Sequence, residues 1–463
     1  MLVVIATFAA FLALFTAIGV ASARRSAATP DDYLVASRDV SPWLAALSSV
    51  ATNNSGYMFI GQIGFAYAAG VRSIWLALGW LAGDLMAWVF VHRRVRERSE
   101  SARSVPSLLA GEGRGGRAIV VVAALLTLVF LGTYAAAQLK AGSKSLHVLF
   151  GWDESVGAIL GAVIVVVYCF SGGIRASIWT DAAQSMVMLG AMGALLVYAL
   201  AEVGGLGALF ARLGAIDPSL VELVPEGGSP VALGLWTLGW AGGGLGAVGQ
   251  PHILIRTMAL DSPRSVPRAA GYYFAWFVPF YAAAILVALY ARVLMPDLRD
   301  AELALPALSS QLMPPVLVGV MLAGLFSATM STADSQILSC SAAITHDLWP
   351  RLGESYLANK LGTIGVAALA LTIALFAGSG VFELVLYAWA ALAVTIGPVL
   401  LVVVFGGAPS GRLGVAMMAA GLATMFLWRG LGLDVHLYEI LPGIAAALLA
   451  YAGGRALGRA AEP

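Results

Sequence analysis

The chain has few cysteines, few histidines and little charge. Cys169 and Cys340 are the only cysteines among 463 residues, and two are too few for a disulfide framework or a cysteine metal site. The five histidines are scattered without the spacing of paired metal ligands, and no nucleophile–base pair is apparent, so the sequence does not predict an enzyme. It also lacks a glycine-rich phosphate loop and a basic stripe with interleaved aromatics. ATP-driven activity and nucleic-acid binding are therefore not expected.

What the chain has instead is apolar sequence. Apolar residues make up 60% and charged residues 11%, and the mean hydropathy is +0.88. These values describe a polytopic membrane protein in a lipid bilayer. A spanning helix needs about 20 apolar residues, and roughly thirteen such segments are predicted by that length. They lie near residues 1–23, 42–62, 68–92, 117–148, 154–172, 177–203, 230–256, 268–294, 312–345, 360–379, 382–406, 411–429 and 437–457.

The arginines predict an orientation. They concentrate in the connections around 24–38, 93–117 and 256–268, where Arg256 is taken as a loop residue. With thirteen helices these connections fall on one side, which the positive-inside rule makes cytoplasmic. The N-terminus is then outside and the C-terminus inside, in a multi-pass inner-membrane protein. The first segment ends in a Val-Ala-Ser-Ala sequence that suits a signal peptidase, but it lacks a basic beginning, so we expect a retained helix.

Two predicted helices contain residues that break helices. The second carries the run Ala51–Gly56, and the seventh carries a glycine-rich run from Gly239 to Pro251. Non-helical backbone at membrane depth is tolerated where it lines a cavity, and such a pair of broken segments is typical of inverted-repeat transporters. Within one transporter domain, 1–463, this spacing predicts repeats at 42–203 and 230–406, with 1–23 and 411–457 peripheral. Close helix packing is the alternative explanation for the glycines.

The ninth segment carries the polar run Met330–Gln336. A charged side chain near a membrane centre costs at least about 2.5 kcal/mol, so Asp334 implies a cation, a proton or a buried partner. Ser331 and Thr332 supply adjacent hydroxyls, which suit a hard cation such as sodium. Hydrogen bonds to the preceding turn of their own helix are the alternative role for these hydroxyls.

The chain resembles the sodium:solute symporter family, and within it the sodium/proline symporter branch. The motifs that carry the resemblance are Gly249–Leu254, Ile178–Asp181, Met330–Thr332, Ser341–Thr345 and Tyr438–Gly443. The resemblance implies an all-helical, LeuT-like fold of about thirteen helices in a five-plus-five inverted repeat. It also implies alternating access and sodium-coupled symport of a small organic solute, such as proline, another amino acid or a related metabolite.

The resemblance also implies functional residues. The family's main sodium site corresponds to the carbonyls of Ala51, Asn54 and Ala328 with the hydroxyls of Ser331 and Thr332. Asp181 stands where the family carries an aspartate linked to sodium release or a second ion.

Ser335, one turn after Ser331, and Asp334 are further candidates for that second cation site. A salt bridge from Asp181 to Arg175 is the alternative.

The expected substrate site departs from the proline branch. Asn53 replaces an aspartate, and Asp334 replaces a serine. Gly243 and Ala247 stand where the branch has a tryptophan and a tyrosine, which would enlarge the cavity unless other side chains refill it. The residues expected to bind substrate are Asn53, Ser55, Gly56, Tyr134, Gln138, Gly243, Gly246, Ala247 and Gln250.

Two lysines follow Gln138 on the fourth segment. Lys144 is expected to extend to the membrane interface, whereas Lys140 is open to an anionic substrate group or to Asp334.

Three functions remain open from the sequence. A sodium-coupled symporter is the first, with Na⁺ and a small molecule as its ligands. A proton-coupled or uncoupled carrier on the same fold is the second, because Asn53 and Asp334 alter the expected charges. A transporter-like membrane sensor is the third.

Overall fold

The protein is a bundle of helices. The computed structural model describes residues 1–111, 115–224, 228–376 and 381–460. Within them the chain is helical or irregular apart from one isolated bridge between Val40 and Leu260. The α-helices are α1 Leu2–Ser22, α2 Pro30–Val35, α3 Pro42–Asn53, α4 Ile63–Ala69, α5 Ile74–Met86, α6 Arg93–Arg98, α7 Val105–Leu108, α8 Gly116–Leu126, α9 Gly132–Phe150, α10 Glu154–Val203, α11 Leu206–Ile216, α12 Pro230–Leu245, α13 Pro251–Met258, α14 Val266–Leu294, α15 Ala304–Leu312, α16 Pro315–Ala342, α17 Pro350–Gly353, α18 Tyr356–Phe376, α19 Val381–Val404, α20 Gly411–Gly430 and α21 Ile440–Ala460.

Eleven helical stretches in the described ranges are long and apolar enough to cross a membrane. Two of them are too long for one crossing. Residues 57–98 form a 42-residue stretch and residues 154–203 a 50-residue stretch, whereas about 20 residues cross a bilayer. Each contains a turn at a glycine with positive φ, Gly70 (φ 71°) and Gly173 (φ 56°). Each of these two stretches therefore makes two crossings, and α3 completes the first crossing of the 57–98 stretch. The eleven stretches then make thirteen crossings in the described ranges, the number that the sequence predicts.

Gly173 shows why a glycine makes this turn. Its φ of 56° and ψ of −140° are accessible to glycine but strained for residues with a Cβ. A Cβ there would also lie 2.4 Å from the carbonyl oxygen of Tyr33. The turn therefore reverses the chain between the two halves of α10 and seats α2 against it.

The expected boundaries hold to within a few residues for most segments. The third segment begins at Ile74 rather than near 68, because the Gly70 turn and a 3-10 turn over Gly70–Ser73 precede it. The expected end of the tenth segment, residue 379, lies outside the described residues.

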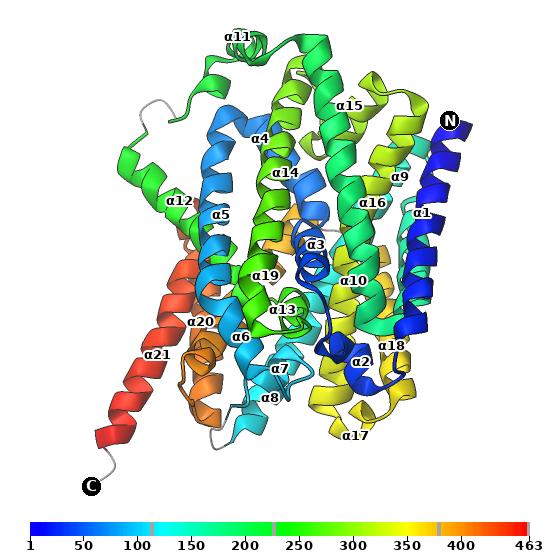
Figure 1. Ribbon diagram of the computed structural model, residues 1–463. Coiled ribbons are helices and arrows are strands. Elements are labelled where there is room, and N and C mark those ends of the chain that lie inside the picture. Colours follow the sequence, from blue (N-terminus) through cyan, green and yellow to red (C-terminus); the bar gives the residue numbers. More distant parts are fainter. Residues whose placement is uncertain (112–114, 225–227, 377–380, 461–463) are drawn as a thin grey trace.

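Burial separates central from peripheral helices. Buried positions make up 83% of the most apolar window in the stretch containing α16 and 89% in α19, but 22% in α21. Figure 1 shows α1 and α21 at opposite edges of the bundle, with α16 and α19 between them. The polar residues of α16 are therefore enclosed by protein, where they can meet partners from other helices.

The two ends of the bundle differ in charge. The chain termini lie at opposite ends (Figure 1). We call the end with α2, α7, α8 and α17 the arginine-rich end, because Arg117 and Arg351 lie in α8 and α17, Arg38 follows α2 and Arg103 precedes α7. The other end carries the N-terminus, α11 and α15.

Helices α5 and α12 approach each other through glycines. A Cβ on Gly83 would lie 1.8 Å from the carbonyl oxygen of Ala241, and a Cβ on Gly244 would lie 1.9 Å from that of Trp80. Real Cβ atoms do not come this close to backbone, so both positions require glycine at the observed helix separation. This is the small-residue contact that membrane helices use to pack closely.

We expect Gly244→Ala to destabilise the protein by about 1–3 kcal/mol, the usual cost of overpacking, because backbone must move to admit the methyl group. Gly271→Ala on α14 is the matched control, since a Cβ at Gly271 meets nothing within 4 Å. Thermal unfolding of both purified variants in detergent measures the difference. Equal melting temperatures for the two variants would contradict the packing assignment.

Candidate functional site

The first helix break lies where the sequence predicts it. Helix α3 ends at Asn53, and a π-helical turn over Tyr57–Gln62 leads into α4. The backbone N–H of Asn54 makes the last bond of α3, to Val50. The carbonyls of the next residues point past the helix end without a helical partner. Ser55 starts the next turn, because its hydroxyl accepts the backbone N–H of Tyr57 at 3.1 Å.

Two adjacent hydroxyls of α16 meet these carbonyls. The Ser331 hydroxyl lies 3.2 Å from the Ala51 carbonyl oxygen and 3.3 Å from that of Ala328. The Thr332 hydroxyl lies 2.9 Å from the Thr52 carbonyl oxygen and 3.0 Å from that of Ala328. Both side chains are fully buried. The structure therefore brings together two hydroxyls and three carbonyls from two helices.

Four of the five expected sodium ligands take part in this cluster, and Thr52 is an addition that the sequence did not reveal. The fifth expected ligand, the Asn54 carbonyl, lies at the same break; the Asn54 side-chain N–H₂ donates to the Val50 carbonyl at 2.7 Å, and its Oδ1 is buried without a hydrogen-bond partner among the described residues. All these groups are neutral oxygen donors, which suit a sodium ion. The hydroxyls need only rotate to turn their lone pairs toward a cation.

A buried charge cluster lies one turn further along α16. Arg256 donates to Asp181 at 3.0 Å, and its guanidinium lies 3.9 Å from Asp334. All three side chains are fully buried. Asp334 also accepts hydrogen bonds from Tyr168 at 2.6 Å and from Ser335 at 2.7 Å.

The cluster joins four helices. Ser48 of α3 donates to Asp181 at 2.6 Å and accepts from Arg256 at 3.0 Å. Arg256 belongs to α13, Asp181 to α10 and Asp334 to α16. Two carboxylates face one guanidinium, and Asp181 Oδ1 is buried without a partner among the described residues. One additional positive charge would make the cluster neutral.

These contacts correct two expectations. Arg256 is not a loop residue: α13 extends to Met258, and the side chain is fully buried. Arg175 does not pair with Asp181 but with Asp32 of α2, at 2.6 Å. Burial alone would raise the pKa of Asp32, but its hydrogen bonds to Arg175, Ser26 and Ser37 outweigh burial and bring the pKa below the usual value.

The second break is shorter than the sequence predicts. Gly242, Gly243 and Gly244 lie inside α12, which continues to Leu245. The helix tightens into a 3-10 turn over Gly246–Gly249, and Gln250 is extended before Pro251 begins α13. The alternative explanation therefore holds for the three-glycine run, which packs against neighbouring helices, while the break falls at 246–250.

Several expected substrate residues meet at the first break. Gln138 Oε1 accepts the backbone N–H of Gly56 at 2.8 Å, and the Tyr134 hydroxyl donates to Ser55 at 3.2 Å. The Gln138 Nε2 and Asn53 Oδ1 atoms are buried without partners among the described residues. This region therefore offers polar groups that the described part of the protein does not use.

Gly246, Ala247 and Gln250 lie at the second break. Gln250 Nε2 donates to the Trp389 carbonyl at 3.0 Å, and its Oε1 is buried without a partner in the described part of the chain. Trp389 in turn donates its indole N–H to the Gly243 carbonyl at 2.9 Å. Trp389 thus connects α19 to both sides of this break.

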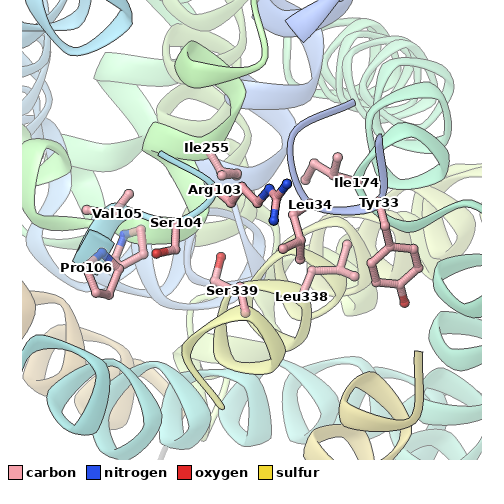
Figure 2. A pocket seen from close by; sticks show the side chains of 12 residues that line it. Tyr33, Leu34, Arg103, Ser104, Val105, Pro106, Ile174, Ile255, Leu338 and Ser339 are labelled. Atoms are coloured by element: carbon pink, nitrogen blue, oxygen red, sulfur yellow. The ribbon is translucent and has the colours of Figure 1, made fainter. Parts of the chain in front are cut away.

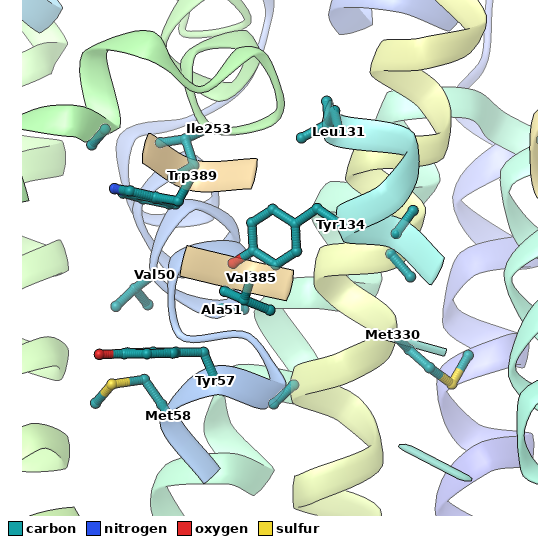
Figure 3. Close-up of a cluster of buried hydrophobic side chains, with 14 of the residues drawn as sticks. Val50, Ala51, Tyr57, Met58, Leu131, Tyr134, Ile253, Met330, Val385 and Trp389 are labelled. Carbon is teal, nitrogen blue, oxygen red and sulfur yellow. The ribbon is translucent and has the colours of Figure 1, made fainter. Parts of the chain in front are cut away.

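The space beside Gly243 is filled by aromatic rings from other helices. A Cβ on Gly243 would lie 3.2 Å from the Trp80 ring. The Trp80 and Trp389 ring centroids are 5.2 Å apart, and Tyr57 stacks on Trp80 at 5.9 Å. Figure 3 shows Tyr57, Trp389 and Tyr134 gathered beside Ala51. Beside Gly243 other side chains therefore refill the space, the stated exception to the expected enlargement of the cavity, because α5 and α19 supply rings there.

Ion pairs connect the helices at both ends of the bundle. Lys144 does not simply extend to the interface, because it pairs with Asp300 at 2.8 Å and Glu302 at 2.7 Å. At the arginine-rich end, Arg103 pairs with Asp31 at 3.5 Å and with Glu354 at 3.0 Å.

A small cavity adjoins Arg103, with Ser339, Leu34 and Ile255 in its lining (Figure 2). Its volume of about 20 Å³ has room for about one water molecule. Ser339 donates to the Ser335 carbonyl, so the cavity lies one helical turn from the charge cluster.

Comparisons with known proteins identify the family of this chain. The model of the sodium:solute symporter family matches residues 33–408. The sodium/proline symporter of Escherichia coli (strain K12) is 32% identical over 440 residues, covering 90% of this chain and 86% of that protein. The osmoregulated proline transporter OpuE of Bacillus subtilis (strain 168) is 28% identical, covering 91% and 88%.

Solved structures share the fold. A Na⁺-coupled sialic acid symporter in a substrate-bound outward-open state matches with a TM-score of 0.79 and 19% identity, over 97% of this chain and 96% of that one. Mhp1, a nucleobase-cation-symport-1 family transporter, matches with a TM-score of 0.61 and 17% identity, over 92% and 95%. The LeuT-like expectation is confirmed, and so is the expectation that the protein is a transporter rather than an enzyme. The chain belongs to the sodium:solute symporter family.

Proposed function

We propose that this protein carries a small amino acid into the cell together with sodium, with proline as the first substrate to test. The observation that carries the proposal is the meeting of Ser331 and Thr332 with the Ala51, Thr52 and Ala328 carbonyls at a helix break. The break also offers buried polar atoms without partners in the described part of the chain. The proline transporters among its relatives support the choice of substrate class.

The sodium ion would be held by the oxygens of Ala51, Ala328, Ser331 and Thr332, with Asn54 and Thr52 beside them. The ion would replace the hydroxyl–carbonyl hydrogen bonds between α3 and α16, and so clamp the two helices together. Asp181, Asp334 and Ser335 would form a second site beside this one that couples ion binding to transport. Arg256 would supply one positive charge to it.

The substrate would lie at the first break, against Asn53, Ser55, Gly56, Tyr134 and Gln138, and beside Gly243, Gly246, Ala247 and Gln250 of the second. The carbonyls that end α3 carry partial negative charge, and the backbone N–H groups that begin the next helical segment carry partial positive charge. An amino acid matches both, because its ammonium suits the first and its carboxylate the second.

Transport would proceed by alternating access between the repeats 42–203 and 230–406. The arginine-rich end would face the cytoplasm, with the N-terminus outside. The Lys144 pairs with Asp300 and Glu302 would close the outer side, and the Arg103 pairs with Asp31 and Glu354 the inner side.

Uptake into proteoliposomes tests the proposal. We expect labelled proline, or another member of an amino-acid and carboxylate panel, to accumulate when a sodium gradient is imposed and not with a potassium gradient of the same size. Accumulation driven by a proton gradient alone would overturn sodium coupling. Absence of sodium-dependent uptake across the panel, together with absence of sodium-induced stabilisation, would overturn the assignment as a sodium-coupled carrier.

Proton coupling is the second candidate, favoured by the charge cluster. Two fully buried carboxylates face one guanidinium, so a proton would neutralise the remaining charge. In this case Asp334→Asn is expected to abolish the proton-driven component while leaving binding of the substrate in place.

A further inference from the structure

A buried carboxylate on α5 is connected to the first helix break through a tyrosine. The Tyr273 hydroxyl of α14 donates to Asp84 Oδ2 at 2.6 Å, and Asn53 Nδ2 lies 2.5 Å from the same hydroxyl oxygen. Asp84 and Tyr273 are each 1% exposed. None of the ion pairs formed among the described residues includes Asp84. The Asp84 carboxylate thus has the Tyr273 hydroxyl as a partner and no counter-ion among the described residues.

The direction of the hydrogen bonds fixes the orientation of the Asn53 amide. In the ionised state of Asp84 the carboxylate can only accept, so in that state the Tyr273 proton points to Asp84. The Tyr273 oxygen is then left with lone pairs and can only accept from Asn53, which must present Nδ2 to it. The amide oxygen, Oδ1, must face elsewhere, and it is buried without a hydrogen-bond partner among the described residues.

We infer that Asp84 and Tyr273 are positioning residues that turn Asn53 Oδ1 into a ligand-facing acceptor for sodium at the α3 break. This inference rests on the proposed function. Asn53 directly follows Thr52, whose carbonyl belongs to the oxygen cluster with Thr332. An acceptor one residue from that cluster suits a positive ion, so we place Asn53 Oδ1 at the sodium ion rather than among the substrate contacts.

The relay from Asp84 through Tyr273 to Asn53 also makes the acceptor stronger. Each hydrogen bond in a chain polarises the next in a low-dielectric interior. An ionised Asp84 therefore polarises the O–H bond of Tyr273 and, through it, the N–H bond of Asn53, which raises the negative charge on Asn53 Oδ1. Asp84 thus acts on the ion through Tyr273 and Asn53, and no carboxylate has to be buried directly beside the break.

Sodium-dependent stabilisation measures this effect without a substrate. The wild-type protein and its variants, in nanodiscs, are unfolded thermally at increasing NaCl with choline chloride holding the ionic strength constant. We expect Asp84→Asn and Tyr273→Phe to raise the half-saturating sodium concentration about tenfold, the usual effect of losing a hydrogen bond to a charged group. A merely structural role would lower the melting temperature in choline and leave the half-saturating concentration unchanged.

A control on the same helix isolates the relay. Tyr281 of α14 is also buried, and its hydroxyl has no hydrogen-bond partner among the described residues. Tyr281→Phe removes the same atom and is expected to keep the half-saturating sodium concentration within about twofold, because no charged hydrogen bond is lost.

A charge swap tests the direction of the relay. In the double variant Asn53→Asp with Asp84→Asn, the amide introduced on α5 can donate to Tyr273, which then donates to the carboxylate introduced on α3. The charge stands directly at the break, so sodium affinity is expected to return to within about threefold of the wild type. If Asp84→Asn fails to fold, Tyr273→Phe and the swap still decide the question.

The outcomes separate the two proposals. Unchanged sodium dependence in Tyr273→Phe and Asp84→Asn, with loss of sodium stabilisation in Ser331→Ala, would overturn the relay and keep the sodium site. Absence of sodium stabilisation in the wild type would overturn the sodium site and the relay with it.

Discussion

Replacing Arg256 by glutamine is expected to destabilise the protein by roughly 3–5 kcal/mol, the cost of removing one partner from a buried ion pair. Asp181 and Asp334 would then be two fully buried carboxylates without the guanidinium that lies 3.0 and 3.9 Å from them. Transport is expected to be lost, because Arg256 donates to Ser48 of α3, Ser177 of α10 and Ser335 of α16. Thermal unfolding of the detergent-purified variant measures the stability.

Further variants of the same cluster show whether unbalanced charge causes the loss of stability in Arg256→Gln. Asp334→Asn alone leaves a neutral Asp181–Arg256 pair and is expected to be tolerated. Adding Asp334→Asn to Arg256→Gln restores the wild-type net charge of the cluster and is expected to recover part of the stability. Arg264→Gln, close by in the chain but exposed, is the matched control. Wild-type stability in Arg256→Gln would show that the three charges are not energetically linked.

The helix break at α3 could be predicted from the sequence because its cause is local. Asn53, Asn54, Ser55 and Gly56 are poor helix formers that hydrogen-bond to nearby backbone or lack a Cβ, and apolar segments surround them. The predicted break and the observed end of α3 therefore coincide. The Ser331–Thr332 pair could be identified for a similar reason, since hydroxyls in an apolar segment are conspicuous.

The three-glycine run of α12 shows where local signals fail. Glycine weakens a helix, so the run Gly242–Gly244 suggests unwinding. In the structure these residues stay helical, and neighbouring helices pack closely against them: α5 against Gly243 and Gly244, and Leu441 of α21 against Gly242. The sequence cannot distinguish these two uses of glycine, since the difference lies in a helix far away along the chain.

Partners of charged residues were the least predictable part of the site. Arg256 lies near Arg264 and Arg268 in the sequence, and its burial depends on α13 continuing past the Pro251 break. Asp84 and Trp80 lie in an apolar segment that contains no obvious break, and their importance appears only when α14 and α19 are placed beside them. Family resemblance did not reveal them, because neither residue belongs to the motifs that carry it.

Replacing Ser331 or Thr332 by alanine is expected to raise the half-saturating sodium concentration about tenfold for each hydroxyl lost, and about a hundredfold for both. Each hydroxyl contacts a carbonyl of α3 and one of α16, so its loss removes a ligand and a contact between the helices. Sodium-dependent thermal stabilisation in nanodiscs, with choline chloride as the replacement salt, gives these concentrations directly.

Ser327→Ala is the matched control for both substitutions. Ser327 lies one turn before Ser331 on the same helix, is fully buried, and donates to Ala323 of its own helix at 2.6 Å. Its loss removes a buried hydroxyl without touching α3, so sodium dependence should stay within about twofold of the wild type.

By linkage, substrate affinity in the Ser331 and Thr332 variants should become less sensitive to sodium by the same factor as sodium affinity becomes less sensitive to substrate. If both variants kept wild-type sodium dependence, the oxygen cluster would be only a contact between α3 and α16. Coupling would then have to reside in the Asp181–Arg256–Asp334 cluster, where the uncompensated carboxylate supplies the remaining site for a cation or a proton.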